Sequence, residues 1–398
     1  MDDSEKEHTV KPPSPRIFVL SILLALLALD VRITVAVLGW QPLGLDWAPL
    51  WAASRISAID IQSVYDFARV TRAQEHLIGI TSGARPFIYP PSALAIIAPF
   101  SVIPVLPSYV VWASVTGAIY LAVSAKLTRR WWILPLACPF VLTAIAGQTT
   151  FLVGGLLILG LQFLEKRPAY AGIILGMATA IKPQTFILVP LALVLAQKWR
   201  PLAYWGASAT GMVLLSLGLF GPDVWLKWFA ALPRFQALVG NNPALVNNSI
   251  TPYALAQRVG CAGWWVFVAG AGPAVASIWA TFGTRTCTAD RVVALVGGAV
   301  LLSPYAMNYE LALIAPALLA GRTDDIKAAA LILVLSLSLL FGFGFGGIIL
   351  AMAPVIVRPL RRIWPRNPKK WGSKAETHVE GHIGGHALGW AEAQQGRS

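Results

Sequence analysis

Apolar segments alternate with short polar loops along most of this chain, and the loops are of two kinds that take turns. Loops of one kind carry lysine or arginine, at residues 126–130, 166–167, 198–200, 285–291, 322–327 and 358–362. Loops of the other kind carry amides, acids, tyrosines and prolines, as in Gly147-Gln148 and Lys182-Pro183-Gln184. Lysine and arginine accumulate on the cytoplasmic side of membrane proteins. The alternation therefore predicts that the chemically capable loops converge on the opposite, extracytoplasmic face.

The apolar segments predict an all-α integral membrane protein, a polytopic helical bundle. A perpendicular crossing needs about 20 residues, and several segments are shorter. We expect about twelve crossings with both termini cytoplasmic, because basic residues flank both ends. The expected crossings lie at Ile17–Trp40, within Ile88–Ala125, at Trp131–Gly147, Thr149–Leu164, Pro168–Ile181, Gln184–Ala196 and Pro201–Phe220, within Thr251–Thr281, and at Arg291–Ser303, Tyr309–Ala320, Ile326–Leu340 and Gly344–Val357.

The remaining segments define the domain organisation. Residues 1–16 form a polar cytoplasmic lead, and residues 17–357 form the membrane domain. Its first outer loop, residues 41–87, contains two helix-like stretches that we expect to lie on the membrane surface as amphipathic helices. Its second outer loop spans residues 221–250. Residues 358–398 are basic and rich in glycine and alanine, which predicts a disordered tail.

Composition supports lipid as the solvent of this fold. The 398 residues are 57% hydrophobic and 12% charged, whereas soluble domains carry about 25% charged residues. The net charge of +13 lies in the basic loops and the tail. It therefore needs no nucleic-acid partner, and we expect membrane lipids instead.

Asp46 is the first candidate for chemistry, because it directly follows the first apolar segment. A carboxylate near the membrane interior is costly unless it is functional or paired. Such a group could act as a general base. Asp46 also precedes the helix-like stretch Trp47–Ile59, and aspartate is a preferred N-cap residue. The sequence leaves both interpretations open.

The first outer loop also carries four arginines, which the positive-inside rule disfavours on that face. An anionic lipid phosphate would explain them, because arginine binds phosphate with two hydrogen bonds. The alternative is ion pairing within the loop, to Asp60, Asp66 or Glu75. The four arginines are Arg55, Arg69, Arg72 and Arg85, of which we take Arg85 and Arg55 as phosphate-binding candidates.

The other polar loops supply groups suited to sugars. Amides bind hydroxyl groups without adding charge, and Lys182 lies in the same loop as one such amide. Snorkelling at the membrane interface is the alternative for Lys182. The candidates for sugar or acceptor binding are Tyr89, Gln148, Gln184, Asn248, Tyr305, Tyr309 and Glu310, with Lys182 as a candidate for phosphate.

No metal or cofactor is expected. The polar loops contain no DxD or HExxH pattern. His378, His382 and His386 recur at a spacing of four in the tail, but the glycines between them oppose a helix that would align them.

In their order along the chain, these motifs resemble glycosyltransferase family 87 over about residues 17–345. The motifs are Asp46, Trp51-Ala52-Ala53, Val64-Tyr65-Asp66, Phe87-Ile88-Tyr89-Pro90-Pro91, Gly147-Gln148, Gly172–Gly176 before Lys182-Pro183-Gln184, Ser303-Pro304-Tyr305 and Tyr309-Glu310-Leu311. The resemblance implies a GT-C helical bundle and a polyprenyl-phosphate-linked sugar donor, often of mannose. It also implies that Asp46 is the catalytic base. Glu310 departs from the aspartate that is usual in the family.

The expected function is an inverting, metal-independent transfer of a hexose, such as mannose, to a lipid or glycan acceptor at the extracytoplasmic face. The membrane would be a bacterial inner or plasma membrane. One alternative is a transporter or flippase for lipid-linked saccharides. Transporters often show inverted repeats with a site at the bilayer midplane, and the sequence shows no such repeat. A second alternative is an oligosaccharide ligase.

Overall fold

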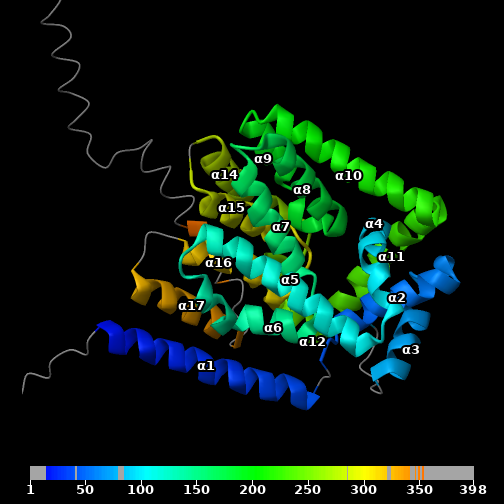
Figure 1. Ribbon diagram of the computed structural model, residues 1–398, viewed down its shortest axis with the longest axis horizontal. Coiled ribbons are helices and arrows are strands. Elements are labelled where there is room, and N and C mark those ends of the chain that lie inside the picture. Colours follow the sequence, from blue (N-terminus) through cyan, green and yellow to red (C-terminus); the bar gives the residue numbers. More distant parts are fainter. Residues whose placement is uncertain are drawn as a thin grey trace, which may run out of the picture. The chain divides into compact units, whose positions relative to one another are not determined.

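The computed structural model describes residues 15–40, 43–78, 85–284, 286–320 and 324–340, with residues 346, 348–349 and 352–353. In this part of the chain every regular element is a helix, apart from one isolated bridge between Ser249 and Met307. The prediction of an all-α protein is confirmed (Figure 1). The tail with its three histidines lies outside the described residues.

Four of the described helices are long and apolar enough to cross a membrane. They are α1 (Pro15–Trp40), α5 (Val105–Leu127), α10 (Trp199–Phe220) and α14 (Trp265–Phe282). Large apolar side chains on these helices are exposed, such as Leu24, Leu215 and Val268. Since a water-soluble protein does not expose such long apolar surfaces, these faces are suited to lipid.

The expectation of about twelve full crossings is not confirmed, because the other apolar helices are short. Helices α7 (Thr150–Phe163) and α8 (Pro168–Ile181) have 14 residues each. At 1.5 Å per residue they are about 21 Å long, whereas the hydrocarbon core is about 30 Å thick. The expected crossing Trp131–Gly147 is split at proline into a 3-10 turn, η3 (Trp131–Leu136), and α6 (Cys138–Ala146).

The expected crossings at Gln184–Ala196 and Tyr309–Ala320 are divided in the same way. The first becomes η4 (Pro183–Phe186) and α9 (Val189–Leu195), and the second becomes η5 (Asn308–Leu313) and α16 (Ala315–Leu319). Proline lacks the N–H that a continuing helix requires, and Pro183, Pro190 and Pro316 lie at these breaks. Helices α15 (Thr288–Leu301) and α17 (Asp325–Leu340) follow the predicted pattern.

The first outer loop folds into α2 (Trp47–Ile59), η1 (Ile61–Ser63) and α3 (Phe67–Ile78). The placement of α2 on the membrane surface was wrong, because residues Trp47–Ser54 are buried inside the protein. Trp47 stacks on Trp112 at 4.8 Å between ring centroids, and its Nε1 donates to Ser108. Apolar residues occur all around residues 47–54 of α2, as in a helix segment that is covered on every side, whereas Ile59 at its end is exposed.

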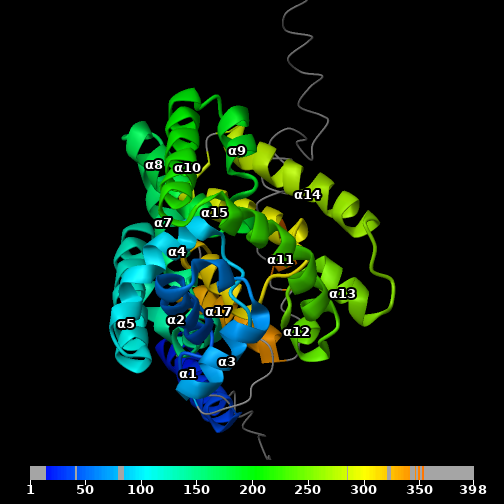
Figure 2. The same cartoon turned by 90° about the vertical axis from the view of Figure 1, so that its right-hand side faces the viewer.

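After the first outer loop, α4 (Pro91–Ile97) and η2 (Ala98–Val102) lead to α5. The second outer loop forms α11 (Pro222–Gly240) and α12 (Pro243–Asn248), and α13 (Pro252–Arg258) follows. Figure 2 shows these three helices in succession between α10 and α14. A loop was expected at residues 221–250, and the 19-residue helix α11 was not predicted from the sequence.

Three of the basic loops lie close to one another, which agrees with the common side that their alternation predicts. Glu165 Oε2 accepts a hydrogen bond from Lys198 at 2.5 Å, and its Oε1 lies 3.1 Å from Arg291. Glu165 follows α7, Lys198 precedes α10, and Arg291 lies in the first turn of α15. The end of α7 and the start of α8 therefore lie at this basic cluster. Their opposite ends lie at the polar loops that carry Gln148 and Lys182.

Candidate functional site

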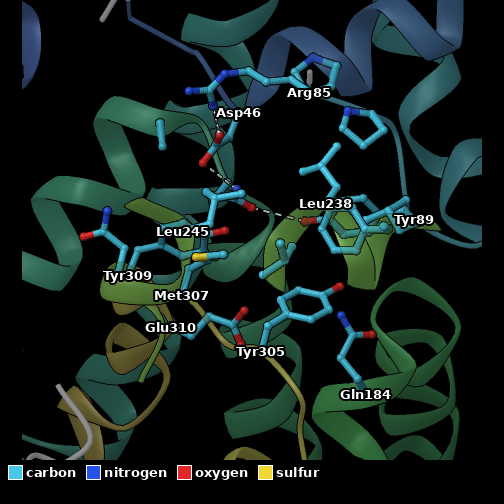
Figure 3. A pocket seen from close by; sticks show the side chains of 18 of the residues that line it. Asp46, Arg85, Tyr89, Gln184, Leu238, Leu245, Tyr305, Met307, Tyr309 and Glu310 are labelled. Atoms are coloured by element: carbon cyan, nitrogen blue, oxygen red, sulfur yellow. Dashed lines mark hydrogen bonds and ion pairs between the residues drawn. The ribbon is translucent and has the colours of Figure 1, made fainter. Parts of the chain in front are cut away.

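The polar loops surround a cavity of about 1010 Å³. Ten of the eleven residues that the sequence proposed for the site line this cavity (Figure 3). They are Asp46, Arg85, Tyr89, Gln148, Lys182, Gln184, Asn248, Tyr305, Tyr309 and Glu310. Residues more than 260 positions apart in the sequence are thus brought to one chamber.

Two glycines place Asp46 against the end of α6. Gly44 and Gly147 both have positive φ, +72° and +73°, a conformation that glycine adopts without a steric penalty. The N–H of Gly44 donates to Ile145 O at 2.8 Å, and the N–H of Asp46 donates to Ala146 O at 2.9 Å. These two hydrogen bonds bring Asp46 beside the loop that carries Gln148.

Both carboxylate oxygens of Asp46 have a partner in the cavity. Oδ1 lies 3.0 Å from the Arg85 guanidinium, and Oδ2 accepts a hydrogen bond of 2.7 Å from Gln148 Nε2 (Figure 3). Within the described residues the carboxylate caps no backbone N–H of α2. The N-cap interpretation of Asp46 is therefore not supported, and the interpretation as a group of the site remains.

A hydrogen-bond chain continues from Gln148 to the loop of Tyr89. The Tyr89 hydroxyl donates to Gln148 Oε1 at 3.1 Å and lies 2.9 Å from Thr149 Oγ1. Burial raises the pKa of Tyr89, so this phenol stays protonated at neutral pH. Trp228 fixes the loop from the other side by donating to Ile88 O at 2.9 Å.

Lys182 and Glu310 form a second ion pair in the cavity, with Nζ 2.8 Å from Oε1. Burial lowers the pKa of Lys182, but the charge and hydrogen bond of Glu310, together with the nearby Tyr89 and Asp46, raise it by more in total. The lysine is therefore a cation at neutral pH. Because its side chain is buried and paired with Glu310, Lys182 does not extend to the membrane interface. Nor is it an unpaired cation that is ready to bind a phosphate.

The loops of Asn248 and Tyr305 are joined across the cavity wall. Ile250 donates to Ala306 O at 2.8 Å, beside the bridge that pairs residues 249 and 307. Asn308 Nδ2 reaches Asn248 Oδ1 at 3.4 Å. Arg258 donates to the carbonyls of residues 246, 247 and 249. The amide of Asn248 is thus carried on a braced loop.

Arg55 does not take part in the cavity. Its guanidinium donates to Ser101 O at 3.3 Å and lies 5.4 Å from the centroid of the Trp51 ring. Its proposed phosphate contact is therefore not supported by its position. Arg69 pairs with Asp60 at 2.5 Å, the partnership within the loop that the sequence offered as an alternative.

Helix α11 supplies a cavity wall that the sequence did not assign to the site. Its lining residues include Trp228, Leu232, Phe235, Leu238 and Val239. The start of α11 has the signals of a helix, with proline at its first position and Asp223 in its first turn. The sequence also missed Thr149, whose hydroxyl lies 2.9 Å from that of Tyr89.

No group of three or more potential metal ligands occurs within the ranges that the structure describes. The polar groups of the cavity are instead two ion pairs, several amides and three tyrosines. The amides and tyrosines can form hydrogen bonds to hydroxyl groups, the two cations can bind an acidic group, and the two carboxylates can accept a proton.

Helices long and apolar enough to cross a membrane, around a cavity lined by both apolar and polar side chains, define the chain as a membrane protein with a large cavity. A family model for glycosyltransferase family 87 matches residues 87–304, more than half of the chain. The chain belongs to glycosyltransferase family 87 and is a membrane glycosyltransferase. Asp46 and Arg85 precede the matched range, and Tyr305, Tyr309 and Glu310 follow it. No curated protein and no solved structure matches the chain.

Proposed function

We propose that the protein transfers a hexose, with mannose as the first candidate, from a polyprenyl-phosphate donor to a hydroxyl group of a lipid or glycan. The observation that carries this proposal is the Asp46 carboxylate, which two side chains hold at the wall of a cavity. A carboxylate in this position can serve as the base that a hydroxyl nucleophile needs.

In the proposed reaction Asp46 takes the proton of the acceptor hydroxyl. The acceptor oxygen then forms a bond to the anomeric carbon while the bond from that carbon to the phosphate oxygen breaks. The products are the glycoside, polyprenyl phosphate and a protonated Asp46, which returns its proton to water. A single displacement inverts the anomeric carbon, so a β-linked donor gives an α-glycoside.

Arg85 is the proposed partner of the donor phosphate. Its side chain and that of Asp46 are about a quarter exposed, at 24% and 25%, so a ligand can reach both. Arginine binds phosphate with two parallel hydrogen bonds. When Arg85 turns to the phosphate it stabilises the leaving group. The same movement releases Asp46 Oδ1, which then has room for the acceptor hydroxyl.

The cavity fits a site at the extracytoplasmic face. The basic ends of α7 and α8 would be cytoplasmic by the positive-inside rule, and both chain termini would share that side. Because these helices are about 21 Å long, their other ends would stop below the outer boundary of the hydrocarbon core. Leu45, Pro49 and Leu50 line this part of the cavity and suit a polyprenyl chain.

The test is transfer of labelled sugar in nanodiscs. Wild type, Asp46→Asn and the control Asp66→Asn receive labelled polyprenyl-phosphate mannose and a lipid extract of the host membrane. Asp66 belongs to the same outer loop but lies outside the cavity lining. We expect wild type and Asp66→Asn to form a labelled product and Asp46→Asn to be slower by about 10²–10⁴-fold.

Equal rates for all three proteins would remove Asp46 as the base but keep the enzyme class. Movement of the intact labelled lipid across the bilayer without a new product would favour the flippase alternative. A product that carries a preassembled oligosaccharide would favour the ligase.

A further inference from the structure

The two ion pairs of the cavity differ in their exposure to solvent. The side chains of Lys182 and Glu310 are only 5% and 9% exposed, the lowest values of any ion pair in the described residues. The Asp46–Arg85 pair is about a quarter exposed. Each pair is neutral overall, so the inner end of the cavity, at Glu310, carries no net charge.

A phosphate would bind poorly at this inner end. A phosphate at Lys182 would either share the ammonium with Glu310, which places two anions side by side, or displace Glu310, which leaves a buried carboxylate without its cation. Separating a buried ion pair in this way is strongly unfavourable. Arg85 can leave Asp46 at less cost, because Asp46 remains bonded to Gln148 and is reached by solvent.

The Lys182–Glu310 pair nevertheless retains free hydrogen-bonding capacity. An ammonium group has three N–H donors, and Glu310 takes one of them. Among the described residues no group donates to the second carboxylate oxygen, and both side chains line the cavity. The pair therefore offers donors and an acceptor side by side.

Two neighbouring hydroxyl groups of a sugar match this arrangement, because each hydroxyl both donates and accepts. One hydroxyl can donate to Glu310 while the other accepts from Lys182, and the ion pair stays intact. Figure 3 shows Tyr305 between Glu310 and Gln184, so an aromatic ring and an amide adjoin the pair. Rings and single amides are common groups in sites for neutral polar ligands.

We propose that the Lys182–Glu310 pair is the subsite for the donor's sugar ring, which it binds through two neighbouring hydroxyl groups. The inference rests on the proposed function and assigns Lys182 to the sugar rather than to the phosphate. It also names the substrate class. The sugar is uncharged, because the carboxylate of a uronic acid would be repelled by Glu310.

The experiment compares binding of bare polyprenyl monophosphate with binding of polyprenyl-phosphate mannose, glucose and galactose. The proteins are full-length wild type and K182M/E310Q in nanodiscs. The double substitution removes both charges at similar volume and leaves no buried charge unpaired. The control is K327M/D324N, which removes an exposed lysine–aspartate pair outside the cavity and leaves no buried charge unpaired.

We expect wild type and the control to bind at least one sugar-bearing lipid more tightly than the monophosphate. In K182M/E310Q this preference should fall about tenfold or more, since it loses hydrogen bonds to charged groups. Its affinity for the monophosphate should change by no more than about twofold, because on this view the phosphate binds elsewhere.

Three results would overturn the inference. One is an equal loss of affinity for the monophosphate and the sugar-bearing lipids in K182M/E310Q, which would return Lys182 to the phosphate. The second is a wild type that binds the monophosphate but prefers none of the three sugars. The third is a wild type that binds no polyprenyl lipid at all, which would overturn the proposed function as well.

The single variant E310Q tests the charge argument with polyprenyl-phosphate glucuronate. This substitution leaves Lys182 without its carboxylate, which the uronate of the ligand can replace. We expect E310Q to bind the glucuronate lipid about tenfold better, relative to the glucose lipid, than wild type does. An unchanged ratio would contradict a sugar contact with Glu310.

Discussion

Gln148 orients Asp46 through one hydrogen bond, in which its Nε2 donates to the carboxylate at 2.7 Å. The carbonyl oxygen of the same amide accepts from Tyr89 at 3.1 Å. Because the two ends of the amide have opposite roles, this pairing fixes which way the side chain of Gln148 faces. The carboxylate oxygen that it holds is therefore set in one direction within the cavity.

Replacement of Gln148 by alanine should lower the turnover number with little change in stability. The carboxylate would keep its charge and its partner Arg85 but lose its orientation, and misplacing a catalytic group can cost about 10²-fold in rate. Initial rates at saturating donor measure the effect. Gln162→Ala is the control, because that amide bonds to Val123 O away from the cavity. Equal losses in both variants would argue against a role specific to Gln148.

Arg85 should matter for the donor in a way that lysine can restore only in part. Arg85→Gln removes the cation that we assign to the phosphate, so the KM for the donor should rise. Arg85→Lys keeps the charge but not the two-pronged geometry of the guanidinium, so its KM should be intermediate. Donor titrations of both variants measure this order.

The control for Arg85 is Arg69→Gln, which removes a cation of the same loop that pairs with Asp60 outside the cavity. Its donor KM should equal that of wild type. A rise in KM as large as that of Arg85→Gln would mean that any charge of the outer loop attracts the lipid. The phosphate would then not be bound by Arg85 in particular.

The sequence predicted the helices and the residues that line the cavity better than it predicted contacts between side chains. Segment Pro168–Ile181 was expected as a helix and is α8, because proline begins it and the Lys182-Pro183 pair ends it. Asp46 and Glu310 were both expected at one face from the alternation of the loops, and both line the cavity. Both predictions came from the apolar segments and the alternating loops between them, which can be recognised without knowing how the chain packs.

The partners of each charge could not be predicted, because they depend on tertiary packing. Lys182 and Glu310 are 128 residues apart, and nothing in the local sequence indicates that they pair. Arg55 was a phosphate-binding candidate alongside Arg85, yet its position on α2 turns it toward Ser101. Helix α2 was expected on the surface because it carries the charged Arg55 after its apolar first turns, and the local sequence does not show that α5 covers Trp47.

Gly147 should not tolerate a side chain. A Cβ at this position would lie 2.8 Å from Trp47 Cβ, and the positive φ disfavours other residues. Gly147→Ala should therefore lower the stability by about 1–3 kcal/mol and displace Gln148 from Asp46. Thermal melting in detergent measures the first effect, and the transfer assay measures the second.

Gly206→Ala is the control for this substitution. Gly206 lies within α10, and an added Cβ there meets no atom within 4 Å. Alanine favours a helix over glycine by about 1 kcal/mol, so this variant should melt at the same or a higher temperature. A Gly147→Ala protein that melts like wild type would show that the loop relaxes without strain.

The native cysteines can show which side of the membrane each end of α14 faces, without a new cysteine having to be introduced for labelling. Cys261 and Cys287 are exposed and lie before and after α14, whereas Cys138 is buried. If α14 crosses from the outer face to the cytoplasm, Cys261 faces outside and Cys287 inside, beside the basic cluster. We expect an impermeant maleimide to label Cys261 in intact cells and Cys287 only after permeabilisation. Cys261→Ser and Cys287→Ser assign each signal.

Although Cys287 is exposed, partial desolvation by its neighbours raises the pKa of its thiol. Only the thiolate reacts, so slow labelling must be separated from inaccessibility. A second reaction at pH about 8.5, near the usual thiol pKa, makes that separation, and denatured protein gives the full signal. Labelling of Cys287 but not Cys261 in intact cells would reverse the topology and place the cavity at the cytoplasmic face. The donor would then be presented from inside the cell.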